Sequence, residues 1–419
     1  MKILHVADLH IDSPLAGLTA YEGAPVEEIR GATRRATENL VRRAIEEPVD
    51  LVVVAGDIFD GDWRDFHTGL FWVDQLGLLH DAGIPVVTVT GNHDAASEVS
   101  RRLRPPPNVT KLSDSTPETK IFDDLGVAVT GQGYATRSVT ADLAASFPDA
   151  DSKLFTIGVL HTSLDGRPGH ERYAPTAVET LRAKGYDYWA LGHVHKREEV
   201  HRDPWIVFSG NLQGRHAREV GPKGATLVEV QSREVNSLDA LELDDVRWHD
   251  CELDVADSRD PDDVLSKVTE CFASLVAADG ERLCAVRVDL VGASPAHDAL
   301  WRDPHGFEAE VRSIANRTGR VWVEKVKIDT ARGLDLARSR EDDAVGAIAA
   351  RIADLRRDPE LLHQFEPLFS DVHRKISADA RSDDGAPVDT RRIGTVDHIR
   401  DCLDASLETI VALLAGEQG

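Results

Sequence analysis

The fold is decided by the opening stretch MKILHVADLH (residues 1–10), in which an apolar run ends in Asp8-Leu9-His10. Short runs of Val, Ile and Leu that end in Gly, Asp, Asn or His are typical of buried strands. The same pattern recurs through the first half of the chain and alternates with helical or polar stretches. This alternation is typical of a layered α/β fold. We expect buried strands at residues 3–7, 51–55, 85–90, 127–130, 154–160, 186–191, 205–209 and 226–230.

Helices are predicted where apolar residues recur three and four positions apart, first over residues 26–47 and 66–81. The pattern then breaks into acidic, irregular sequence around residues 231–250. Residues 255–329 read as a small α/β unit, with helices over 261–278 and 308–317 and strands over 283–290 and 321–327, and further helices are expected over 344–357, 360–377 and 396–415. We therefore predict a main domain over residues 1–250, a small α/β capping domain over 251–335 and a helical C-terminal region over 336–419.

The net charge of the chain limits how it can bind a polyanion such as DNA. The 419 residues include 48 Lys and Arg against 73 Asp and Glu, a formal net charge of −25. Because sequence-independent DNA affinity comes from cations that neutralise phosphates, this composition excludes a protein that coats DNA. Any nucleic-acid function has to be concentrated at a site.

The sequence predicts a cytoplasmic protein. No run approaches the ~18 apolar residues that a membrane span needs, and the chain opens on a strand with no signal peptide. The cysteines are scattered and lack a Cys-x-x-Cys spacing, so neither a zinc cage nor a disulfide framework is indicated. They are Cys251, Cys271, Cys284 and Cys402.

Oxygen and imidazole side chains follow five of the predicted strands. Ligands in open α/β folds gather outside the carboxyl ends of strands, and this donor set suits a pair of manganese, iron or zinc ions. Each motif alone has an ordinary alternative, namely a helix cap, a turn or a histidine satisfied at a strand end; their joint arrangement favours metal. The residues are Asp8 and His10, Asp57 and Asp60, Asn92 and His93, His161, and His193 and His195.

Spacing gives the expected local geometry. Asp57, in a Gly-Asp turn after a buried strand, is the natural bridge between two ions. Asp8 and His10 point the same way if the strand conformation persists, since residues two apart share a face, and the same holds for His193 and His195. The glycines at 56, 91 and 192 permit tight turns before the ligands.

These motifs resemble those of the calcineurin-like metallophosphoesterases, which the chain matches from Asp8 to His195. The matching residues are Asp8-x-His10, Gly56-Asp57-x-x-Asp60, Gly91-Asn92-His93-Asp94, His161 and Gly192-His193-x-His195. Within that superfamily, residues 5–14 and 209–216 look like those of the DNA repair exonucleases of the SbcD kind, particularly the YhaO-like branch.

The resemblance implies an α/β fold in which a metallophosphoesterase β-sandwich is flanked by helices, followed by the small α/β capping domain and the helical C-terminal tail. It also implies two divalent metal ions, with Mn²⁺ as the expected metal. His93 would be free of metal and act as the catalytic residue beside the scissile phosphate. The ligands would be Asp8, His10, Asp57 and His195 at one ion and Asp57, Asn92, His161 and His193 at the other. Asp60 stands where some relatives carry His, so the role of that His is not carried over.

The expected partners are DNA, a coiled-coil ATPase of the SMC type and a second copy of the chain, with no membrane. Arg215 and His216 follow a strand end and are candidates to bind the DNA backbone, although a surface turn explains them equally well. The helical tail would grip the ATPase or pack on the second domain. Phe66, Phe71 and Trp72 lie on the helix that contributes to a dimer interface in the family, with core packing as the alternative.

The favoured interpretation is a DNA exonuclease and endonuclease of DNA repair, acting 3′ to 5′ on duplexes. One alternative is a two-metal phosphodiesterase or phosphatase on a small molecule or phosphoprotein. Protein-phosphatase relatives carry an Arg directly after the last Asp of the second motif, whereas here Gly61 follows Asp60. The other alternative is a non-catalytic scaffold for the ATPase, which a missing ligand would support; none is missing.

Overall fold

A computed structural model describes residues 1–13, 25–60, 66–96, 103–165, 173–332 and Arg351. It divides into two compact units. The first comprises Met1–Cys251, Val268–Asp289 and Glu308–Lys327, and the second comprises Glu252–Lys267, Leu290–Phe307 and the described part of Ile328–Gly419. The helices predicted over 344–357, 360–377 and 396–415 lie outside the described residues.

Two six-stranded sheets form most of the first unit. One sheet contains β1 (Lys2–Val6), β2 (Leu51–Val54), β3 (Val86–Thr88), β4 (Val109–Lys111), β11 (Gly224–Gln231) and β12 (Glu234–Glu242), in the order β12-β11-β1-β2-β3-β4. The strands β1 to β4 run parallel, and β11 joins β1 antiparallel. The carboxyl ends of β1 to β4 therefore meet at one edge of this sheet.

The second sheet repeats this parallel core. It contains β5 (Glu118–Phe122), β6 (Val127–Gln132), β7 (Phe155–His161), β8 (Tyr188–Gly192), β9 (Glu198–Arg202) and β10 (Trp205–Phe208), in the order β5-β6-β7-β8-β10-β9. The four central strands are parallel and the two outer strands are antiparallel to them.

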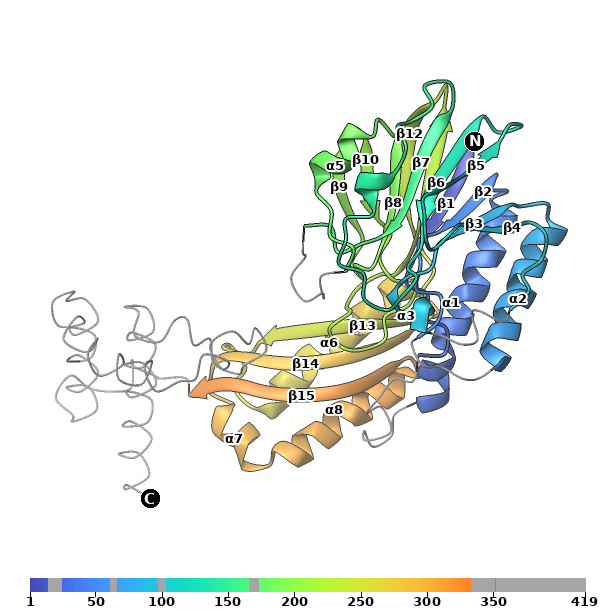
Figure 1. Cartoon of the computed structure of the whole chain (residues 1–419). Helices are drawn as coiled ribbons and strands as arrows, with labels where there is room; N and C mark the ends of the chain where they lie inside the picture. The colour runs from blue at the N-terminus through green and yellow to red at the C-terminus, as the bar shows by residue number, and fades with distance from the viewer. Residues whose placement is uncertain (14–24, 61–65, 97–102, 166–172, 333–350, 352–419) are drawn as a thin grey trace, which may run out of the picture. The chain divides into compact units, whose positions relative to one another are not determined.

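Successive side chains of the central strands point in turn toward the helices and toward the other sheet, and so form the two cores on either side of a sheet. Val52 and Val54 face a core shared with α1 (Val26–Glu46) and α2 (Phe66–Asp81), which lie side by side in Figure 1. Leu51 and Val53 instead join the core between the two sheets, as expected for a strand with apolar residues on both faces. The outer face of the second sheet packs on η2 (Ala144–Ser146) and α5 (Val178–Ala183). This arrangement confirms the predicted β-sandwich flanked by helices.

The prediction of irregular sequence over 231–250 was wrong. β12 pairs with β11 along its whole length, and β13 (Val246–Asp254) begins four residues after β12 ends. β12 is an edge strand in which half-buried Val235 and Leu238 alternate with exposed polar and acidic residues. Such charges on an edge block pairing with other chains, which is why the strand resembles a loop in sequence.

The third sheet has the order β13-β14-β15, with β14 at Leu283–Ser294 and β15 at Val321–Arg332. Its helices are α6 (Pro261–Asp279), α7 (His297–Arg302) and α8 (Pro304–Thr318). The predicted domain boundary at residue 250 falls inside β13, and the three-domain division stays a proposal.

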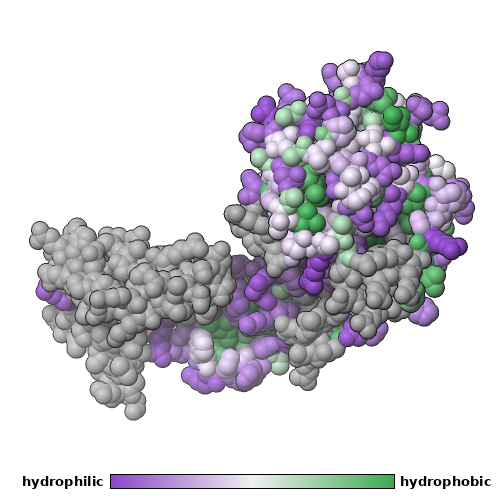
Figure 2. All heavy atoms as spheres, in the orientation of Figure 1, coloured by the Kyte–Doolittle hydropathy of each residue, from purple (hydrophilic) through white to green (hydrophobic). Residues whose placement is uncertain are grey.

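The face drawn in Figure 2 is mostly hydrophilic, with small separate apolar patches on its coloured part. On α2, Trp72 is buried in the core and Phe71 lies under the guanidinium of Arg34, whereas Phe66 and Leu70 are about half exposed at 50% and 55%. Among the described residues, no helix is both long and apolar enough to cross a membrane.

Candidate metal centre

The predicted ligands gather where the carboxyl ends of β1, β2, β3, β7 and β8 meet. Backbone hydrogen bonds fix the first two motifs to each other, because Asp8 N–H donates to Gly56 O at 3.0 Å and His10 N–H donates to Asp57 O at 3.1 Å. The motif loops therefore continue the pairing of β1 with β2 beyond the sheet.

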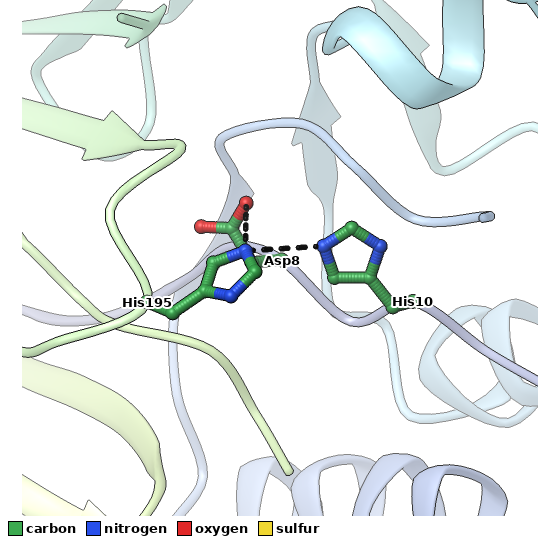
Figure 3. Close-up of side chains that lie close together, drawn as sticks. All are labelled: Asp8, His10 and His195. Atoms are coloured by element: carbon green, nitrogen blue, oxygen red, sulfur yellow. Dashed lines mark hydrogen bonds and ion pairs between the residues drawn. The ribbon is translucent and has the colours of Figure 1, made fainter. Parts of the chain in front are cut away.

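One group of donor atoms comes from Asp8, His10 and His195. The Nε2 atoms of the two histidines lie 3.3 Å apart, and Nε2 of His195 lies 3.8 Å from Oδ1 of Asp8. Figure 3 shows these three side chains turned toward one another. Asp8 and His10 are almost fully buried.

A second group comes from Asp8, Asp57 and His161. Nε2 of His161 lies 3.3 Å from Oδ2 of Asp57 and 3.0 Å from Oδ1 of Asn92. Nδ1 of the same ring bonds the backbone oxygen of Ala55 at 2.9 Å, which aims Nε2 at the carboxylate. The ring of His193 is 5.2 Å from that of His161, so all seven predicted ligands lie in one small region.

Asp57 lies between the two groups. Its Oδ2 is 3.3 Å from Nε2 of His161 and 4.0 Å from Nε2 of His10, and its side chain is 2% exposed. A carboxylate in this position is placed to bridge two cations.

The backbone conformation that brings the predicted ligands together differs from the one expected from their spacing. The strand conformation does not persist, because φ is 53° at Asp8, 43° at His10, 53° at Asp57 and 96° at His193. Positive φ in non-glycine residues carries strain of ~1–3 kcal/mol each and clusters at functional sites. Asp8 and His10 converge through these turns and not through a shared strand face.

Gly192 is required by close approach and not by a positive φ. A Cβ atom there would lie 2.1 Å from the backbone oxygen of Ala55 and 2.9 Å from Cβ of Ala7. The absence of a side chain lets β8 end directly against the motif loops of the other sheet.

Replacing Gly192 by Ala is expected to lower the free energy of unfolding by about 1–3 kcal/mol or more, because backbone atoms must move to admit the methyl group. Urea denaturation measures this change. Gly77→Ala on α2 is the matched control, since nothing lies within 4 Å of its Cβ position, and it should leave stability unchanged or raise it. Equal stability of Gly192→Ala and the wild type would contradict the packing described.

His93 belongs to a short helix, α3 (Asn92–Ala96). Neighbouring side chains in a helix diverge, which separates His93 from the predicted ligand Asn92. Nδ1 of His93 lies 2.8 Å from Oδ1 of Asp60. Burial opposes protonation, but the bond to Asp60 and the charge of Asp57 raise the pKa of His93 above its ordinary value.

Three carboxylates that sequence reasoning left without a role organise this site. Asp60 contacts His93 and accepts a hydrogen bond from Ser13 Oγ at 2.7 Å. Asp94 accepts the N–H groups of Phe59 at 3.0 Å and Gly91 at 3.1 Å, which joins two motif loops, and burial raises its pKa to about 6. Glu219 contacts His195. Asp60 and Asp94 were visible as motif residues, whereas no spacing signal identifies Glu219.

The donor set fits divalent cations. Burial favours the neutral form of His161, yet the field of Asp57 outweighs it and raises the pKa of His161 to about 9. The field of Asp57 therefore favours positive charge at His161, and the site presents carboxylate and imidazole atoms without a thiol. Two further groups of donor atoms lie among the described residues. His10, Asp60 and His93 form one of them beside the site, whereas His249, Asp279 and Cys284 fit less well because Arg247 already donates to Asp279 at 2.9 Å.

The two predicted substrate-binding residues differ in position. Arg215 is mostly buried, with Nη1 3.5 Å from Oδ2 of Asp60 and Nη2 3.4 Å from Nδ1 of His195. His216 has a side chain that is 56% exposed and lies 3.6 Å from Glu219. Arg215 is thus brought into the site, and His216 lies at its rim.

Family models match two parts of the chain. Residues 1–197 match the model described as calcineurin-like phosphoesterase, and residues 248–331 match the one described as metallophosphoesterase YhaO, middle domain. The first match contains all seven predicted ligands.

The chain is also similar to individual proteins. The chain is 33% identical over 339 residues to the uncharacterized metallophosphoesterase YhaO of Bacillus subtilis, covering 79% of this chain and 82% of that protein. It is 26% identical over 227 residues to the DNA double-strand break repair protein Mre11 of Methanopyrus kandleri, covering 49% of this chain and 47% of that protein. A solved structure of a dimetal phosphatase from Danio rerio aligns with a TM-score of 0.34 and 11% identity, covering 55% of this chain and 93% of that chain. From the motifs and the YhaO relationship together, the chain belongs to the calcineurin-like metallophosphoesterases.

Proposed function

We propose that the protein is a Mn²⁺-dependent nuclease that hydrolyses phosphodiester bonds of DNA during repair. The observation that carries the proposal is the convergence of two donor groups on Asp57, with His93 beside them. The relationship to Mre11 proteins, whose name specifies DNA double-strand break repair, supports DNA as the substrate. The chain spans only 47% of the Mre11 protein of Methanopyrus kandleri and 36% of the Mre11 protein of Methanosarcina mazei, to which it is also 26% identical, so the activity of these proteins is only proposed for this chain.

A bound metal pair supplies a water nucleophile at neutral pH and positive charge for the phosphoryl oxygens. The residues proposed to hold it are Asp8, His10, Asp57 and His195 at one ion and Asp57, Asn92, His161 and His193 at the other.

The protein's own acid is His93. Its Nδ1 is engaged by Asp60, which leaves Nε2 to donate a proton to the leaving 3′ oxygen. Asp60 stabilises the protonated ring, which is the form that such a donor needs. Arg215, whose guanidinium lies between Asp60 and Glu219, is the residue proposed to contact a neighbouring phosphate of the strand.

The remaining expectations belong to the same proposal. A second copy of the chain would dock on α2, where Phe66 and Leu70 are exposed beside a core-packed Trp72. We also propose an SMC-type ATPase as the partner and the cytoplasm as the location. The tail helices of this chain that would bind the ATPase lie outside the described residues.

The test is hydrolysis by the purified protein with Mn²⁺ on linear duplex DNA, single-stranded DNA and bis-p-nitrophenyl phosphate. The proposal predicts metal-dependent cleavage of duplex DNA that chelation by EDTA abolishes. Activity on the small ester alone would support the small-molecule phosphodiesterase instead. Metal binding without hydrolysis of any substrate would support the scaffold.

A further inference from the structure

Glu219 is a buried carboxylate placed directly behind a predicted metal ligand. Its side chain is 8% exposed, and Oε1 lies 2.6 Å from Nδ1 of His195. It lies between β10 and β11, 24 residues beyond His195 and just after the family-like segment 209–216.

The two nitrogens of His195 face different partners. Nδ1 faces Glu219, whereas Nε2 faces Asp8 at 3.8 Å and His10 at 3.3 Å. With Nδ1 as the donor to Glu219, Nε2 presents its lone pair to the first donor group. A carboxylate behind a ligating histidine fixes the tautomer and orientation of the ring and raises its basicity.

Glu219 is itself held firmly. Oε2 accepts the side-chain N–H of Asn211 at 2.9 Å and the backbone N–H of Arg215 at 2.7 Å. The carboxylate therefore has a fixed orientation in the loop that also positions Arg215.

Arg215 connects this carboxylate to the His93 side of the site. Its Nη2 lies 3.7 Å from Glu219 and its Nη1 lies 3.5 Å from Asp60. Glu219 thus lies behind His195, and Asp60 lies behind His93. The two carboxylates share one guanidinium.

We propose that Glu219 is a positioning residue that orients His195 and thereby supports one of the two metal ions while leaving the other unaffected. The second donor group is built from Asp8, Asp57 and His161, with Asn92 beside His161. The described contacts of His161 do not include Glu219. The inference rests on the proposed metal centre, because it concerns the strength of one ion's binding there.

The test counts bound Mn²⁺ by the electron paramagnetic resonance signal of the free ion in titrations of Glu219→Leu, Glu219→Gln and Glu324→Gln. Glu324 is an equally buried Glu paired with Arg287, and serves as the control for loss of a buried carboxylate. In Glu219→Leu, one ion should bind about 10- to 100-fold more weakly and the other unchanged. Glu219→Gln keeps an acceptor for His195 and should recover much of that affinity, and Glu324→Gln should bind both ions as the wild type does.

A double-mutant cycle separates positioning from general damage. If Glu219 acts through His195, adding Glu219→Leu to His195→Ala should cause little further loss of Mn²⁺ affinity. Two normal ions in Glu219→Leu, equal weakening of both ions, or full additivity with His195→Ala would each overturn the inference. If the wild type binds no Mn²⁺, the proposed function itself fails, a result distinct from an unaltered Glu219→Leu beside a two-ion wild type.

Discussion

Replacing Asp57 by Asn is expected to remove metal binding and phosphodiester hydrolysis together. Asp57 is the carboxylate between the two donor groups, within 3.3 Å of His161 and 4.0 Å of His10. Asn keeps the size and an oxygen that can accept the His93 N–H, a bond of 2.9 Å to Oδ1 in the wild type, but it lacks the charge that a bridging ligand supplies. Loss of several kcal/mol of transition-state stabilisation corresponds to a fall in kcat of roughly 10³-fold or more.

Two measurements check this prediction: the metal content after dialysis against Mn²⁺, and hydrolysis of bis-p-nitrophenyl phosphate. Asp187→Asn is the matched control. The Asp187 carboxylate accepts the Thr156 N–H at 2.7 Å and lies at the amino ends of β7 and β8, at the opposite ends of these strands from the site. The control should keep two ions and full activity. An Asp57→Asn protein that binds two ions as tightly as the wild type would show that Asp57 is not the bridge.

Replacing His93 by Ala is expected to separate metal binding from catalysis. His93 forms a separate donor group with His10 and Asp60 and belongs to neither group that contains Asp8, so both ions are expected to bind normally. Loss of general-acid help should lower kcat by about 10²–10⁴-fold.

The separation itself is the informative result. His80→Ala, on the exposed part of α2, is the control and should change neither quantity. Full activity in His93→Ala would remove the proposed acid, whereas loss of both ions would place His93 among the ligands.

The strands that build the site could be predicted because they are buried on both faces and rich in apolar residues. The strands missed by the sequence are the short or outer ones: β4, β5, β9, β12 and β13. In β5 the pattern is almost fully exposed, so burial leaves no alternation to detect.

The candidate ligands could be predicted because each follows such a strand. Their backbone could not, since the positive φ values at Asp8, His10 and Asp57 are imposed by hydrogen bonds between loops distant in sequence. Glu219 has the same explanation: its contact with His195 depends on how the loop after β10 folds back, which local periodicity does not encode.

The central claim is that these residues hold two metal ions. Anomalous diffraction at the manganese edge from Mn²⁺-loaded crystals tests it most directly. The account predicts two peaks about 3.5–4 Å apart, one on either side of the Asp57 carboxylate, with His195 at one and His161 at the other. No peak beside Asp57, or a peak only at the cluster of His249, Asp279 and Cys284, would contradict it.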